Sequence, residues 1–173
     1  LDVQDQVDLE VLRTRLTARL WAHDELAEQT WNPLLTVPAE AVYSLVARQT
    51  GAPDERAQAL TARLGGLADH LDAVRGRLGQ MPQVHVETAI AQTLGVVSLL
   101  GDPVDALLAR APARRSALDE ARSQAEQALR EHAGWLEDQL GEADLDPRLG
   151  PRDFAAKLWY SLDTETGPDT SRR

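Results

Sequence analysis

The sequence predicts an all-α fold, an antiparallel bundle or array of about six to seven helices. Its composition is the first observation behind this prediction: the 173 residues include 27 Leu and 26 Ala but only 12 Val and one Ile. Helices favour Ala and Leu, whereas strands favour β-branched and aromatic residues. The second observation is that apolar residues recur at spacings of three and four. The third is that all nine prolines fall at or beside segment boundaries.

The amino-terminal part of the chain is expected to form a helical hairpin. Residues 5–30 carry a row of leucines on one face, which predicts a long amphipathic helix. The row consists of Leu9, Leu12, Leu16 and Leu20. Residues 31–38 form a predicted turn with two prolines, and residues 38–49 form a short helix closed by Gly51.

Residues 53–80 show a heptad pattern, which predicts antiparallel packing inside a bundle rather than a free coiled coil. The pattern consists of Leu60, Leu64, Leu67, Leu71, Val74 and Leu78. The pair Gly65 and Gly66 interrupts it, and either a close helix crossing or a kink would account for the pair.

Four further helices are predicted in the second half of the chain. Residues 84–100 present Ile90, Leu94 and Val97 as their apolar row, and a short helix begins at Asp102 and Pro103. The helix over 113–140 has a mostly alanine seam, which favours a central place because small side chains let neighbours approach closely. That seam is Leu118, Ala121, Ala125, Ala128, His132 and Trp135. The last helix, 151–162, is expected to bury Phe154, Leu158 and Leu162.

The predicted organisation is one helical domain over residues 1–165, followed by a flexible tail over 166–173. The formal net charge is −10, which disfavours nucleic acid and anionic membrane surfaces as partners. No signal peptide or spanning segment is recognised, and the absence of cysteine favours a reducing cytoplasm.

The sequence offers no recognisable catalytic constellation. None of the four histidines has His, Asp or Glu three or four residues away, so no local zinc-ligand pair is found. A metal site assembled from distant helices is the less favoured alternative, and His132 is interpreted as a core histidine. No nucleophile elbow or phosphate-binding loop is found. We therefore assign no catalytic, cofactor-binding or metal-binding residue. Trp159 and Tyr160 are singled out as the pair expected to face a partner or the remainder of a longer protein, whereas in a complete small domain both would more often be packed inside.

Three strings are more specific than amphipathic helices require. They are Thr30-Trp-Asn-Pro-Leu34, Met81-Pro-Gln-Val-His-Val-Glu-Thr-Ala-Ile90, and Asp146-Pro-Arg-Leu-Gly150 with Phe154-Ala-Ala-Lys-Leu-Trp-Tyr160. In order and spacing they resemble the amino-terminal third of a bacterial family known as domain of unknown function 885, over nearly the whole chain.

That resemblance implies a larger protein similar to zinc metallopeptidases of the helical carboxypeptidase type. In such proteins the zinc motif lies in the carboxy-terminal part, so no cofactor is expected in this segment although zinc is implied for the whole family. The segment would form part of the substrate-groove wall and be inactive alone, with the remainder of its own polypeptide as partner. The alternative is a self-contained helical module that binds another protein.

Overall fold

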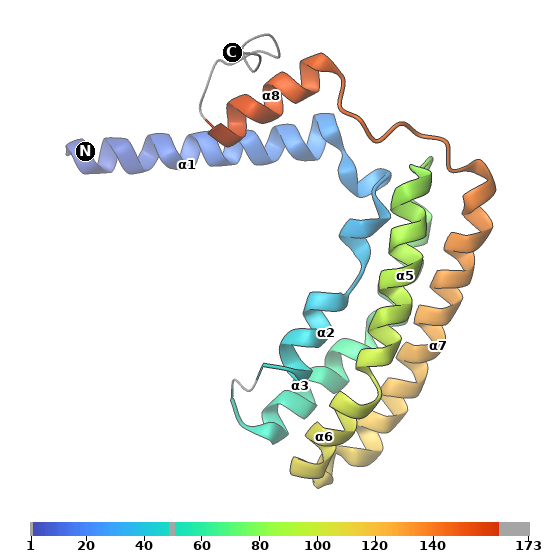
Figure 1. Cartoon of the computed structure of the whole chain (residues 1–173). Helices are drawn as coiled ribbons and strands as arrows, with labels where there is room; N and C mark the ends of the chain where they lie inside the picture. Colours follow the sequence, from blue (N-terminus) through green and yellow to red (C-terminus); the bar gives the residue numbers. More distant parts are fainter. Residues whose placement is uncertain (1, 49–50, 163–173) are drawn as a thin grey trace, which may run out of the picture. The chain divides into compact units, whose positions relative to one another are not determined.

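The computed structural model describes residues 2–48 and 51–162, and within them the chain is all-α (Figure 1). The α-helices are α1 (Val3–Trp21), α2 (Ala39–Val46), α3 (Pro53–Gly65), α4 (Leu67–Arg77), α5 (Gln83–Leu99), α6 (Asp102–Arg110), α7 (Arg115–Gln139) and α8 (Pro151–Leu162). The described residues contain no strand, only one isolated antiparallel bridge between Pro82 and Asp144. The predicted fold class is therefore confirmed.

Contacts group the described residues into two compact units. One unit combines residues 2–28 with 146–162, and the other spans residues 29–145. The single domain predicted over 1–165 stays a prediction, and the predicted tail over 166–173 lies outside the described residues.

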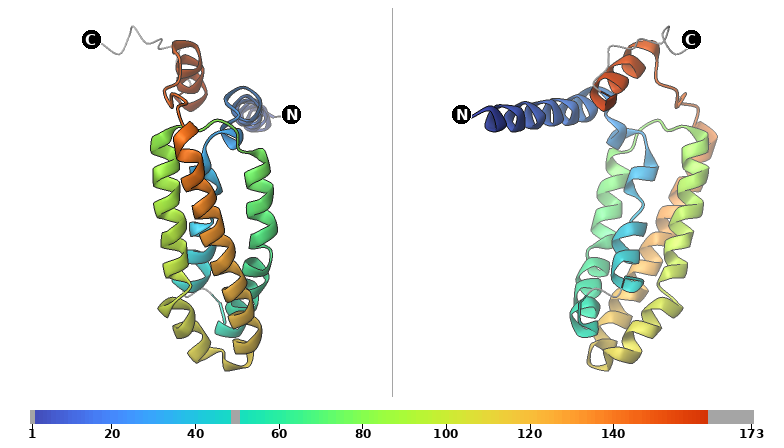
Figure 2. Two further views of the ribbon diagram at one scale, coloured as in Figure 1. Left: turned by 90° about the vertical axis from the view of Figure 1, so that its right-hand side faces the viewer. Right: turned by 60° about the vertical axis from the view of Figure 1, so that its left-hand side comes forward.

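The unit over 29–145 is an antiparallel bundle in which α2, the α3–α4 pair, α5 and α7 alternate in direction (Figures 1 and 2). Helix α2 packs on α3 and α5, and α7 packs on α3, α4 and α5. These four elements therefore surround the interior of the bundle. Two clusters of buried apolar side chains fill this core, a larger one beneath α2, α3 and α6 and a smaller one near the start of α5.

Helix α7 packs on three helices of this unit, α3, α4 and α5, along the alanine seam that the sequence predicted. Ala121, Ala125 and Ala128 are buried along it, together with Leu118 and His132. A side chain of one carbon lets the backbones of neighbouring helices come close, and α3, α4 and α5 all use that proximity. The seam therefore sets the diameter of the bundle.

The predicted helix over 53–80 is divided into α3 and α4 at Gly66, which lies outside the helical region at φ −93° and ψ 2°. Of the two interpretations left open for the glycine pair, the kink is thus the one observed. The heptad side chains Leu60, Leu64, Leu67 and Leu71 remain buried on both sides of the break, because a single non-helical residue redirects the axis without changing the face.

A buried arginine joins α2 to α3. The Arg56 side chain is 6% exposed and donates hydrogen bonds to the carbonyls of Leu45, at 2.8 and 3.0 Å, and of Val46, at 3.0 Å. These carbonyls belong to the last turn of α2. They have no backbone N–H partner within the helix, and they form the negative end of the helix dipole. One cation therefore satisfies a helix terminus and keeps its own charge paired with dipoles.

The apolar row predicted for α5 was wrong at Leu94, whereas Ile90 and Val97 are partly buried and pack against the core. The buried residues are Ala89, Thr93 and Val96, with Val86 a turn earlier, whereas Leu94 is exposed. Helix α5 packs between α2 and α7, so apolar side chains surround much of it and periodicity alone does not select the inner face.

The first helix is shorter than the predicted 5–30. Helix α1 begins at Val3 behind a capping box in which the Asp2 and Asp5 side chains accept each other's backbone N–H groups. After Trp21 the chain widens into a π-turn over Ala22–Leu26, which ends at Ala27 in a left-handed conformation with φ 45°. Alanine is a strong helix former, so the sequence carried no signal for this stop.

The last helix also differs from its prediction. Phe154 is 44% exposed rather than buried, and Leu158 is half-buried. The side chain of Leu162, the third residue expected in the core, lies outside the described residues. Among the described residues, the main packing partner of helix α8 is α1.

One helical stretch in the described part of the chain, Gln83–Arg110, is long and apolar enough by composition to cross a membrane. It comprises α5 and α6, whose buried side chains belong to the bundle core. Core helices of bundles have the same composition, so this stretch is weak evidence for a membrane span.

Shortening a buried side chain of α7 should destabilise the bundle. Leu129 is fully buried, so Leu129→Ala is expected to lower the free energy of unfolding by about 2–5 kcal/mol through lost burial and an unfilled cavity. The matched control is Leu35→Ala at an exposed leucine, with an expected change below about 0.5 kcal/mol. Urea unfolding followed by circular dichroism measures both, and equal losses in the two variants would contradict the assigned core.

Candidate functional site

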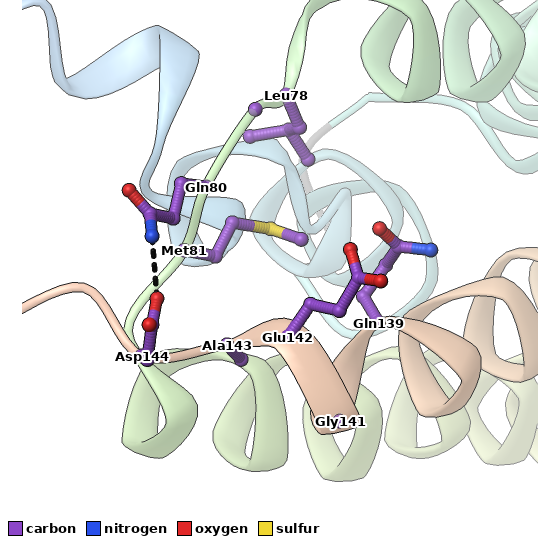
Figure 3. Close-up of a pocket in the computed structure, with 9 residues that line it drawn as sticks. Leu78, Gln80, Met81, Gln139, Gly141, Glu142, Ala143 and Asp144 are labelled. Carbon is purple, nitrogen blue, oxygen red and sulfur yellow. Dashed lines mark hydrogen bonds between the residues drawn. The ribbon is translucent and has the colours of Figure 1, made fainter.

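A concavity lies in the unit over 29–145, at the end of the bundle where α4 passes to α5 and where α7 ends (Figure 3). It is a half-open groove of about 600 Å³. Its lining residues come from two connections and are Leu78, Gly79, Gln80, Met81, Gln139, Gly141, Glu142, Ala143 and Asp144.

Backbone pairing holds these two connections together. The Leu145 N–H donates to the Met81 carbonyl at 3.3 Å, and Pro82 and Asp144 form the antiparallel bridge. The Gln80 side-chain amide also donates to the Asp144 carboxylate (Figure 3). Each connection therefore forms one wall of the groove, and the hydrogen bonds between the two connections hold these walls together.

Two of the strings that carry the family resemblance meet at this end of the bundle. The indole of Trp31 stacks on the imidazole of His85, with ring centroids 5.8 Å apart. The Gly79 N–H donates to the Thr30 carbonyl at 2.8 Å, and the Asn32 side chain accepts from the Leu34 N–H at the start of a 3₁₀-helix. Residues 30–34 and 81–90 are thus specific because they build this end together, which the sequence alone did not reveal.

The groove is polar at its rim and apolar at its base. Glu142 and Asp144 supply carboxylates and Gln80 and Gln139 supply amides, while Met81 is buried beneath them (Figure 3). The lining includes no histidine, serine, threonine or lysine, so it holds neither a nucleophile with its base nor a metal-ligand set. Such a surface can accept hydrogen bonds and attract a cationic group.

His132 is a core histidine, as the sequence predicted. Its side chain is 2% exposed and stacks on Trp135 at 5.6 Å, and its Nδ1 atom has no hydrogen-bond partner. The pKa of His132 is lowered from 6.5 to about 4, mainly by burial and to a smaller extent by electrostatic interaction with Arg75 and His70. The imidazole is therefore neutral at physiological pH.

The described residues bring no group of three or more His, Cys, Asp or Glu side chains into metal-binding proximity. The His23 ring instead lies 2.8 Å from the carboxylate of its neighbour Asp24 at the surface. Of the sequence-predicted pair on α8, Trp159 is 43% exposed, whereas Tyr160 is half-buried with its ring 5.2 Å from that of Trp21. Only one member of the pair is thus available to a partner.

The leucine row of α1 is a second exposed apolar surface, and the sequence did not predict that it would be exposed. The leucine row of α1 was expected to pack in a hairpin, yet α1 has no buried residue. Leu12, Leu16 and Leu20 are each about 60% exposed. A row of leucines signals that something packs on a helix, but it does not say what.

A comparison with protein families shows the family to which the chain belongs. The model of a family described as "Bacterial protein of unknown function (DUF885)" matches residues 1–171. The chain belongs to this family. The resemblance stated from the three strings is therefore confirmed at the level of the family, whose description assigns no activity.

One solved structure shares the fold of this family member. It is described as "a putative lipoprotein of unknown function from Shewanella oneidensis" and matches with a TM-score of 0.89 at 20% sequence identity. The match covers 98% of the present chain but 32% of the Shewanella chain, so the family member spans about a third of that protein's length. Among curated proteins, no sequence matches.

The buried His132 should make the bundle less stable in mild acid. The unfolded chain binds a proton at the normal pKa near 6.5, whereas the folded chain resists protonation until about pH 4. Stability is therefore lost as pH falls from 6.5 to 4, by about 2–3 kcal/mol from this residue. Replacing the ring by His132→Leu should remove that contribution, which urea titrations at several pH values would measure as the difference between the two proteins.

Carboxylates such as Asp146, whose pKa the Arg148 guanidinium lowers to about 2, add the same acid sensitivity to both proteins and cancel in this difference. The control His23→Gln removes a histidine at the surface and tests whether the loss of any imidazole produces the same change. An unchanged slope in His132→Leu would show that His132 is not buried in its neutral form.

Proposed function

We propose that the chain is the amino-terminal helical segment of a longer hydrolase similar to zinc metallopeptidases, and that it forms part of the wall of a substrate groove. The observation that supports this proposal is the asymmetry of the structural match, in which nearly all of the present chain corresponds to a third of a larger protein. The nature of the hydrolase rests on the family resemblance seen in the sequence.

The residues described do not fit a zinc site. Zinc in a catalytic centre takes three protein ligands, most often with histidine among them. The groove carboxylates Glu142 and Asp144 have no histidine beside them in the lining, and His132 is buried in the core with its ring stacked on Trp135. In this proposal the metal ligands belong to the remainder of the polypeptide, and no catalytic step is assigned to the present residues.

A wall requires rigidity and a surface that selects substrate. The bundle over 29–145 offers the first through its two clusters of buried apolar side chains, and the rim with Glu142 and Asp144 offers the second. The two carboxylates would favour substrates with a cationic group near the reacting bond, since opposite charge raises the local concentration of such molecules.

A self-contained interaction module is the second candidate. The exposed leucines of α1 and the exposed Trp159 favour it, because contiguous apolar surface marks contact sites. A module of this kind would function without any further part of its own polypeptide, which separates it from the first candidate.

The cellular location stays a prediction. The lack of cysteine favours the cytoplasm. The description of the Shewanella protein as a putative lipoprotein favours the cell envelope for that protein, and for this chain it is an alternative that fractionation would test.

The metal content of the full reading frame tests the proposed function. The polypeptide read beyond residue 173 is expected to purify with about one zinc per chain and to hydrolyse peptides until a chelator removes the metal. The segment 1–173 should bind no stoichiometric zinc and show no hydrolysis. A reading frame that stops at Arg173, or a longer protein without zinc, would contradict the proposal.

The wall can be tested separately in the active full-length protein. Glu142→Gln is expected to raise KM several-fold for peptides that carry a basic residue and to leave kcat unchanged, because it removes attraction and not chemistry. Glu137→Gln, at an exposed position of α7 outside the groove, is the matched control and should leave both parameters unchanged. Equal kinetics for the two variants would remove the groove from the substrate path.

A further inference from the structure

Helix α1 is apolar on two nearly opposite sides. At about 100° per residue, Leu9, Leu12, Leu16 and Leu20 fall on one side, which we call the leucine side. Val3, Val7 and Val11 fall on the other, together with Ala18 and Trp21. Most of the charged residues occupy the two flanks between them, whereas Asp5 lies on the leucine side. A helix with two opposed apolar sides is suited to lie between two layers of structure.

Helix α8 covers only part of one of these two sides, the side that carries the valines. The Tyr160 ring contacts Trp21, which continues the valine side, at a centroid distance of 5.2 Å. Ion pairs from Arg152 to Glu25, at 3.4 Å, and from Lys157 to Glu28, at 3.3 Å, fix α8 just beyond the end of α1. The leucine side faces away from these contacts, and its side chains are exposed along the whole helix.

Local interactions alone would hold α1 only weakly. Its 19 residues span about 28 Å, and in proteins most of the stability of a helix comes from packing of an apolar face rather than from helix propensity. The capping box at Asp2 and Asp5 adds on the order of 1 kcal/mol in comparable helices, which is less than packing along a full apolar face supplies. The leucine side is therefore expected to be covered in the working protein.

We propose that the leucine side of α1 is the docking face for a helical part of the same polypeptide that follows residue 173. This inference rests on the proposed function. The length of the matched structure supports this occupant: the Shewanella chain is about three times as long as the present one and contains the same fold. About two thirds of such a polypeptide is thus available to pack on a segment that displays an uncovered apolar face.

A second copy of the chain is the competing occupant. Charge alone would permit it, because Asp5 and Asp8 lie in one half of α1 and Arg15 and Arg19 in the other, so two antiparallel copies would pair. The leucine row is too short for this purpose, since it spans fewer than two heptads and independent coiled coils use three to four or more. An intramolecular partner avoids the cost of association and can use a short face.

The absence of cysteine from residues 1–173 gives a direct test. Single replacements Leu12→Cys and Leu16→Cys place a thiol on the leucine side, and Thr17→Cys places one on the adjacent polar flank as the matched control. In the full-length polypeptide, both leucine-side thiols are expected to react with a maleimide at least tenfold more slowly than the control. In the segment 1–173, all three should react at similar rates.

Three results would overturn the proposal. Equal labelling of Leu16→Cys and Thr17→Cys in the full-length protein would show that the leucine side is free. Protection in the segment that rises with protein concentration would assign the face to a second copy, and protection at every concentration would assign it to residues 29–145. Zinc content is measured on the same full-length samples, so protected thiols without zinc would refute the metallopeptidase assignment while supporting the docking face.

Discussion

The close approach of helices along α7 is the constraint on which the bundle depends. Three alanines in its seam permit α3, α4 and α5 to pack around one axis, and the leucines of those helices fill the space that the alanines leave. A larger side chain at Ala125 would separate α7 from its neighbours and disturb all these interfaces together. The buried Arg56 and the polar His132 are accommodated within this framework and do not create it.

The sequence predicted the parts of the fold that periodicity controls. The alanine seam, the heptad row of α3 and α4 and the all-α class follow from apolar spacing, which reports which face of a helix is covered. The end of α1 did not follow, because a left-handed Ala27 has no compositional signal. The inner face of α5 was misjudged because a helix with neighbours on two sides is apolar on both.

The candidate site was beyond sequence reasoning for a different reason. Its groove is formed by connections that are 64 residues apart at the Gln80–Asp144 hydrogen bond, and neither connection carries a periodic pattern. The strings around Trp31 and His85 were recognised as specific, but only their stacking explains why those residues occur there. These strings are therefore explained by contacts between irregular segments that lie far apart in the sequence, and not by a catalytic or binding role of their residues.

The uncovered leucine side of α1 also bears on how such a polypeptide is made. A ribosome adds roughly 5–20 residues per second, so the first helix of a protein three times this length emerges tens of seconds before its carboxy-terminal part is synthesised. During that interval the bundle over 29–145 can complete its own core, whereas four leucines remain in water. Apolar surface that is exposed during synthesis promotes association between unfinished chains, so this side of α1 is a site of aggregation until it is covered.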